Sequence, residues 1–184
     1  VLDGAMGTTL HAYELPLAIA RHCTSKLTDD INAIRALGFR GEALPSIGAV
    51  ARLIITTRHA SEPHAWTLEV DAGKKSEIKP AALSQGTTIE VRDLFYATPA
   101  RLKFLKTDRS EAEAVREVVR RLAMSRPDVA FTLAGEERAP VTWGAAPEGD
   151  SLARLGDVLG PEFRANAIAI DAEREGVRVH GFAG

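Results

Sequence analysis

Two short segments of this sequence combine the residue types that bind phosphate groups. The first offers two hydroxyl groups followed by a mobile ammonium group, in Thr24, Ser25 and Lys26. The second places an aromatic residue and an arginine between two glycines and ends in an acid, in Gly38, Phe39, Arg40, Gly41 and Glu42. Glycine lets the backbone adopt dihedral angles that other residues resist. The residues from Glu42 onward predict the first turn of a helix, whose free N–H groups attract anions. We therefore interpret the two segments as able to bind one triphosphate together.

Each segment also has a purely structural interpretation. Short glycine patterns before helices arise by chance, and Arg40 can pair with an acid instead of a phosphate. Glu42 is a poor phosphate ligand and is better suited to fixing the loop. Arg21 and His22 fit the basic end of a helix, where cations complement the dipole. The sequence has no P-loop or G-x-G-x-x-G pattern, so neither a P-loop nor a Rossmann site is supported.

The elements around these segments follow from the spacing of apolar residues. Helical spacing predicts helices at residues 14–22, 28–37 and 42–50. From residue 51 the period becomes that of strands, which are predicted at 53–57, 66–70, 75–79 and 87–93. In the last of these strands we expect Ile89 and Val91 to face inward. His59 and His64 lie in the first connecting loop, where two histidines without partners are more often polar surface than a metal site.

The C-terminal part of the chain predicts a long helix and then a second domain. The helix at 110–125 is expected to bury Val115, Val118, Val119 and Leu122. Further elements are predicted as strands 129–133 and 140–143, a helix at 151–159, and strands 167–171 and 176–182. The turn residues at 147–150 predict the domain boundary, which gives domains 1–146 and 147–184.

The composition indicates a globular protein of a reducing compartment. The chain has 184 residues, of which 45% are hydrophobic, a formal net charge of -2 and a single cysteine, Cys23. No apolar run is long enough to cross a bilayer and no signal peptide is apparent, so we expect a cytoplasmic protein without a membrane partner. Basic residues gather around the long helix, as a surface for DNA or as an ordinary solvated face, at Lys103, Lys106, Arg109, Arg116, Arg120, Arg121 and Arg126.

Several motifs in order resemble one family. The segments Arg21 to Leu27, Gly38 to Leu44, Gly86 to Phe95 and Thr98 to Arg101 resemble the N-terminal ATPase region of the MutL family of DNA mismatch-repair proteins. The resemblance extends from about Glu14 to the C-terminus. It implies an α+β two-layer sandwich of the GHKL (Bergerat) ATP-binding type, with a mixed, largely antiparallel sheet and helices on one face. It also implies that the chain ends with the beginning of an α/β transducer domain of the ribosomal S5-like kind.

The same resemblance implies roles for single residues. It places the two phosphate-suited segments at the triphosphate of ATP, and Gly86 and Thr87 near the adenine. Asp3 corresponds to an aspartate that receives the adenine amino group, although Ala5 stands where the family has a glycine. The first eleven residues also resemble the start of homocysteine methyltransferases. Those enzymes need zinc-binding cysteines, and this chain offers only Cys23.

The family hydrolyses ATP slowly with a glutamate base and an asparagine that binds Mg²⁺, both on a helix that precedes these motifs. This chain does not contain that helix, so we expect no catalytic residue and no metal ligand in it, and no turnover by the chain alone. ATP and Mg²⁺ are the cofactors that the resemblance implies, and whether this chain is itself an enzyme stays undecided.

Two functions of different classes are open. The first is an ATP-driven mismatch-repair protein that forms a homodimer, binds DNA weakly and relays detection by a mismatch-recognition protein of the MutS family. The second is an interaction module that keeps the fold without nucleotide turnover. Titration with nucleotide separates them, because only the first requires affinity for ATP.

Overall fold

The computed structural model describes residues 12–20, 41–135, 138–147 and 150–184. The chain forms two compact units, Val1–Leu105 and Lys106–Gly184. The boundary predicted at 147 lies inside the second of them, and the assignment of domains 1–146 and 147–184 stays a prediction. No helix within the described residues is long and apolar enough to span a membrane.

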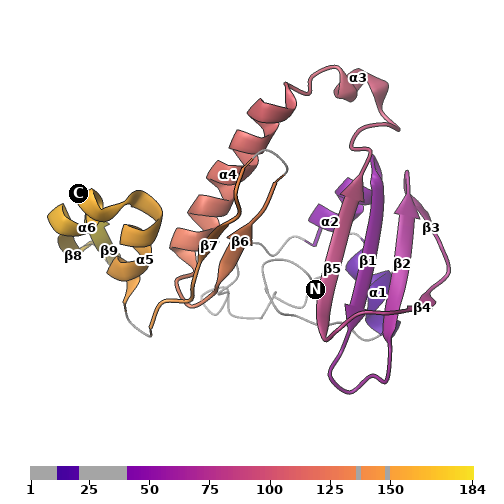
Figure 1. Cartoon of the computed structure of the whole chain (residues 1–184), viewed down its shortest axis with the longest axis horizontal. Coiled ribbons are helices and arrows are strands. Elements are labelled where there is room, and N and C mark those ends of the chain that lie inside the picture. The colour runs from indigo at the N-terminus through magenta and orange to yellow at the C-terminus, as the bar shows by residue number, and fades with distance from the viewer. Residues whose placement is uncertain (1–11, 21–40, 136–137, 148–149) are drawn as a thin grey trace. The chain divides into compact units, whose positions relative to one another are not determined.

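The first unit is built on an antiparallel sheet of five strands (Figure 1). The strands are β1 (Arg52–Arg58), β2 (Ala65–Asp71), β3 (Lys74–Lys75), β4 (Lys79–Ala81) and β5 (Gly86–Arg92). Their order is β3-β2-β1-β5, and β4 also pairs with β2. The β-branched run of β1 therefore becomes the central strand, which confirms the strands predicted at 53–57, 66–70 and 87–93.

Short helices pack on one face of this sheet. Leu53 and Ile55 of β1 are fully buried against Leu68 and Val70 of β2. The helices that contribute to the same core are α1 (Leu15–Ala18), which follows a 3-10 turn η1 (Ala12–Glu14), and α2 (Ala43–Gly48). This arrangement confirms the α+β class and the helix predicted at 42–50. The helix predicted at 14–22 is shorter, because its C-cap is Ile19. The helix predicted at 28–37 falls outside the described residues.

The edge strand predicted at 75–79 is instead divided into β3 and β4. In the register with β2, Val70 faces Lys75 whereas Thr67 faces Lys79, so the edge carries one residue more than its partner. An extra residue in an antiparallel pair is a bulge, and it interrupts the ladder locally. Ser76 lies in it, where its amide donates to the Glu69 carbonyl at 2.8 Å and its hydroxyl accepts from the Glu69 amide at 3.1 Å.

Ile89 and Val91 are on the core face of the sheet, as predicted, but they are not buried. They lie opposite Ile55 and Leu53 in the register and so belong to the face that carries the core. Even so, Ile89 is 40% and Val91 44% exposed, since among the described elements α1 and α2 cover β1 and β2 and not β5. The alternation was therefore read correctly, but the cover over this strand was not.

The second unit combines helices with two hairpins. The helices are α4 (Asp108–Ser125), α5 (Ser151–Leu159) and α6 (Pro161–Asn166). One hairpin pairs β6 (Phe131–Leu133) with β7 (Val141–Trp143), and the other pairs β8 (Ile168–Arg174) with β9 (Val177–Ala183). The predicted helix at 151–159 is confirmed, and so are the two strand pairs. The short turn α3 (Pro99–Leu102) precedes this unit.

The long helix α4 begins earlier than predicted and is less buried. Thr107 caps it through a bond from the Ser110 amide at 3.4 Å, and Glu111 accepts from the Lys106 amide at 2.9 Å. Within this helix only Ala123 is fully buried, whereas Val115 is 52% and Val118 56% exposed. Leu122 is 37% exposed, and Val119 alone of the four predicted residues packs on the small core. The helical period was correct, but an apolar stripe does not by itself show that something covers it.

A buried arginine organises the second unit. Arg154 of α5 is fully buried, and its guanidinium donates to the carbonyls of Ala123 at 2.9 Å and Val129 at 2.7 Å. It also donates to the carbonyls of Pro127 at 3.2 Å and Gly144. Its charged group lies 5.8 Å from the centre of the Phe131 ring. One side chain therefore connects the end of α4, the loop after it and the end of β7.

Candidate functional site

The structure describes four of the predicted ATP-binding residues. These are Gly41, Glu42, Gly86 and Thr87, all in the first unit. The others lie outside the described residues, namely Asp3, Thr24, Ser25, Lys26, Gly38, Phe39 and Arg40. The predicted convergence of residues 24–26 with residues 38–42 on one triphosphate is therefore not tested.

Gly41 and Glu42 lead into α2. Gly41 has φ 64°, a left-handed conformation that glycine adopts without strain. Glu42 is the N-cap of the helix, and its carbonyl accepts from the Ser46 amide at 3.0 Å. Its carboxylate makes no capping bond to the first turn of the helix. Local geometry thus explains why glycine stands at position 41.

Gly86 and Thr87 begin strand β5. Gly86 has φ 135°, and a side-chain carbon added there would meet nothing within 4 Å. The backbone at this position is therefore open to close approach, and a residue with a side chain would be strained. The hydroxyl of Thr87 lies 2.8 Å from the hydroxyl of Thr57 on the neighbouring strand β1. An open backbone beside an oriented hydroxyl fits the flat edge of a nucleotide base.

The end of α2 and the start of β5 lie at opposite ends of strand β1. The end of α2 and the segment that follows it are hydrogen-bonded near the start of β1. The Gly73 amide donates to the Gly48 carbonyl at 2.8 Å, and the Phe95 amide donates to the Val50 carbonyl at 2.9 Å. Gly86 pairs with Arg58, the last residue of β1, so it lies at the other end of that strand.

Thr57 is the residue that sequence reasoning missed. It was read only as part of a buried β-branched run, but it is a fully buried hydroxyl beside Thr87. A polar residue in the third place of the series Leu53, Ile55 and Thr57 was the available signal, since alternate residues of a strand share one face.

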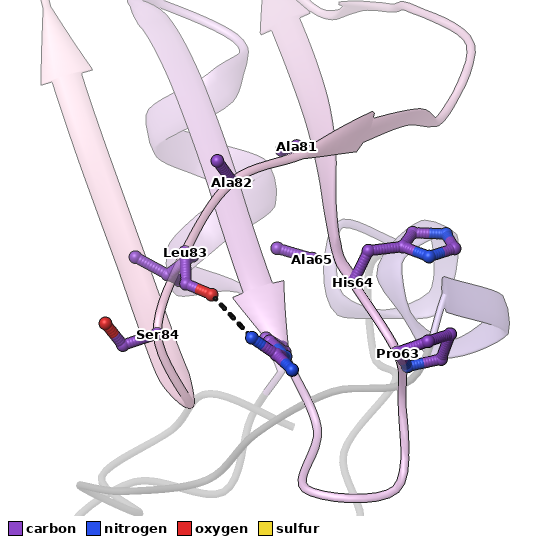
Figure 2. Close-up of a pocket in the computed structure, with 8 residues that line it drawn as sticks. Pro63, His64, Ala65, Ala81, Ala82, Leu83 and Ser84 are labelled. Carbon is purple, nitrogen blue, oxygen red and sulfur yellow. Dashed lines mark hydrogen bonds between the residues drawn. The ribbon is translucent and has the colours of Figure 1, made fainter.

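A shallow hollow lies next to this end of the sheet (Figure 2). It has a volume of about 590 Å³ and is lined mostly by small or apolar residues between the β1–β2 loop and the segment that leads into β5. Arg58 donates to the carbonyls of Leu83 and Glu62 at 3.4 Å each, which holds the loop against that segment. None of the four described residues of the predicted ATP-binding set lines it, so we do not identify it with the nucleotide site.

The two loop histidines have ordinary neighbours. His59 Nδ1 lies 2.9 Å from the Ser61 hydroxyl, and the His64 ring lies 4.5 Å from the ring of Trp66. Among the described residues no group of three His, Cys, Asp or Glu side chains could hold a metal ion.

The segment after β5 forms a polar corner. Asp93 has φ 52° and Phe95 φ 67°, two unusual conformations for residues with side chains. Arg52 bridges Asp93 at 3.1 Å and lies 5.1 Å from the centre of the Tyr96 ring. The Tyr96 hydroxyl donates to Asp71, and this hydrogen bond is the main reason that the pKa of Tyr96 is raised. These contacts give the segment a structural role, because they hold it against the start of β1 and the end of β2.

Four arginines of and just after α4 form ion pairs with acids of the same unit. Glu117 pairs with Arg121 at 3.1 Å, as residues four apart on a helix can, and with Arg120 at 3.7 Å. Arg126 pairs with Asp128 at 2.7 Å, and Arg116 lies 3.9 Å from Glu113. This pattern favours a solvated helix face, and a DNA surface here stays a prediction.

Comparison with known proteins identifies close relatives. The chain is 73% identical over 180 residues to a DNA mismatch repair protein MutL of Rhodopseudomonas palustris strain TIE-1, covering 96% of this chain and 30% of the relative. It is also 73% identical over 173 residues to a DNA mismatch repair protein MutL of Nitrobacter hamburgensis, covering 92% of this chain and 29% of the relative. The chain thus spans about 30% of the length of the curated relatives that it matches. A search of protein-family models found no match.

A solved structure has the same fold. The Aquifex aeolicus MutL ATPase domain complexed with ADP matches with a TM-score of 0.68 and 26% identity, over 90% of this chain and 57% of that one. The likeness agrees with the helix-covered antiparallel sheet of the first unit and confirms the fold class expected from the motifs.

Proposed function

We propose, from the premise that this chain belongs to the MutL family of DNA mismatch repair proteins, that it forms part of an ATP-binding site. The observation that carries the proposal is the start of β5, where the open backbone of Gly86 adjoins the oriented hydroxyl of Thr87. We assign the adenine of the nucleotide to this place. The solved relative that holds ADP supports the assignment of a nucleotide to this fold.

The phosphates are assigned to the other segments. We propose that the backbone around Gly41, together with Arg40 and the groups at Thr24, Ser25 and Lys26, receives the triphosphate, because amides and cations favour that charge. Asp3 is proposed as the acceptor of the adenine amino group.

The metal has no assigned ligand in the described residues. Mg²⁺ would supply charge neutralisation for the phosphates when ATP is bound. We propose that the residues that hold it, like the general base, belong to a part of the protein other than the described residues, and no step of hydrolysis is assigned to this chain.

The wider activity is proposed for the whole protein. In it, slow ATP hydrolysis would be coupled to homodimer formation and to the relay of mismatch detection from a MutS-family protein, with weak binding to DNA. This activity belongs in the cytoplasm of a bacterium, where the DNA is.

Titration of the protein with ATP tests the site. Thr87→Val should weaken binding by about fivefold, since one hydrogen bond contributes about 1 kcal/mol. Thr88→Val is the matched control, because Thr88 is the next residue of the same strand and points to the opposite face. Equal affinity of wild type and Thr87→Val would contradict the assignment, and the absence of any ATP binding would favour the interaction module.

A further inference from the structure

Thr57 is a hydroxyl in an otherwise apolar row. It follows Leu53 and Ile55 on the same face of β1, and all three residues have 0% exposure. Valine has nearly the same shape as threonine and would bury without any polar group. Burial of a hydroxyl costs free energy unless the hydroxyl is hydrogen-bonded. The bonds that Thr57 makes must therefore offset that cost.

The hydroxyl of Thr57 is directed at β5. It lies 2.8 Å from the Thr87 hydroxyl and 3.3 Å from the Gly86 carbonyl. A hydroxyl has one proton to donate and can accept as well. If Thr57 donates to Gly86, the Thr87 hydroxyl donates to Thr57, and if Thr57 donates to Thr87, the proton of Thr87 is directed elsewhere. In both arrangements Thr57 fixes where the Thr87 oxygen lies and restricts its proton.

We propose that Thr57 is a positioning residue for recognition of the nucleotide base, acting through Thr87. The inference rests on the proposed assignment of adenine to Gly86 and Thr87. Adenine and guanine present opposite donors and acceptors on their Watson–Crick edges, so a hydroxyl held in one orientation discriminates between them better than one that rotates. Thr57 would restrict the Thr87 hydroxyl without touching the base itself, since the Thr57 side chain is buried.

A second threonine pair provides the comparison. Thr56 and Thr67 bring their hydroxyls to 3.1 Å across β1 and β2, on the opposite face of the same sheet. It is also a cross-strand hydroxyl pair, one residue away along β1, but it does not involve β5. Loss of this pair should affect the sheet without affecting the base.

The test uses Thr57→Val in the full-length gene product, with affinities for ATP and for GTP measured by titration. Loss of the hydroxyl contact should weaken ATP binding about fivefold. GTP binding should change less, so the preference for ATP falls. Thr57→Ser keeps the hydroxyl and should restore the preference. Thr56→Val should leave both affinities unchanged, and thermal unfolding of every variant separates binding from stability.

Each result decides the matter. If the wild type binds ATP and Thr57→Val matches Thr56→Val in both affinities, the inference is overturned while the proposed function stands. If ATP and GTP weaken equally, Thr57 has only a structural role and the inference is again overturned. If Thr57→Val does not fold, Thr57→Ala and Thr57→Ser make the comparison, because they differ only in the hydroxyl. If the wild type binds no ATP, both the inference and the proposed function fail.

Discussion

Each of the two compact units of this chain is stabilised internally, and the kind of contact that stabilises it differs between them. In the first, Leu53, Ile55 and Leu68 form an apolar core between a sheet and short helices. In the second, the core cluster of buried residues is small, and Arg154 connects its parts through backbone carbonyls. The first unit therefore depends mainly on burial of apolar area, which is nondirectional. The second depends more on directional hydrogen bonds from one buried charge.

The chain offers a probe of each unit. It has two tryptophans, Trp66 in β2 and Trp143 in β7. Variants that keep only one of them report the unfolding of one unit by fluorescence. Unfolding of each variant can therefore be followed in both single-tryptophan backgrounds.

Arg154→Ala should destabilise the second unit by about 4 kcal/mol, because several buried carbonyls lose a charged donor. The Trp143 signal should shift to lower denaturant while the Trp66 signal changes much less. Arg121→Ala is the control, since its side chain is 73% exposed and its pair with Glu117 contributes little. If Arg154→Ala shifted both signals equally, the units would not be separable in the way described.

Ile55→Ala should destabilise the first unit by about 3 kcal/mol, as expected for truncation of a fully buried side chain. The effect should appear in the Trp66 signal. The matched variant in the second unit is Ile168→Ala, because that isoleucine is 71% exposed. Equal losses for the two truncations, measured by urea unfolding, would show that the apolar core of the first unit has been overrated.

Gly48→Ala should destabilise the first unit by about 1 kcal/mol, through overpacking. A side-chain carbon at Gly48 would lie 3.0 Å from Val70 Cγ1 and 3.4 Å from Leu53 Cδ2. Gly135→Ala is the control, because an added carbon there meets nothing within 4 Å. Thermal unfolding of the two variants should differ in that direction, and a more stable Gly48→Ala would mean that the core has room to spare.

Low pH should slightly reduce the stability of the second unit, and high pH should slightly reduce that of the first. The pKa of Asp171 is lowered, mainly by hydrogen bonds from Arg178 at 2.8 and 2.7 Å, so this contact stabilises at neutral pH and is lost as the pH falls through that pKa. The pKa of Tyr96 is raised by its bond to Asp71, so that contribution is lost as the pH rises through it. Arg178→Ala should raise the Asp171 midpoint in an NMR titration, and an unchanged midpoint would rule the pair out as the cause.

Local patterns predicted the elements of both units but not their cover. The β-branched run of β1 and the amphipathic period of α5 were sufficient, because each pattern extends over a whole element. The exposure of Val115 and Ile89 could not be predicted, since amphipathicity identifies the apolar face and not what packs on it. The short helix α6 was missed because six residues contain too little periodic signal.

The sequence indicated which positions of the candidate site require glycine but not the contacts that depend on strand register, and the assignment of these residues to ATP stays a prediction. Gly41 and Gly86 have positive φ, which a sequence can indicate through glycine itself. The contact of Thr57 with Thr87 joins residues 30 positions apart, and it arises only from the pairing of β1 with β5. The carbonyl partners of Arg154 are invisible to sequence reasoning for the same reason, because backbone acceptors have no residue type.

The register of β1 also sets the order in which the sheet can assemble. β2 follows β1 after a short loop, so these two strands can pair within microseconds of chain collapse. β5 must return from beyond β4 to reach the free side of β1, and closing that larger loop is slower. The contact between the Thr57 and Thr87 hydroxyls is therefore expected to form late in folding. A refolding experiment should recover the β1–β2 hairpin before it recovers affinity for a nucleotide.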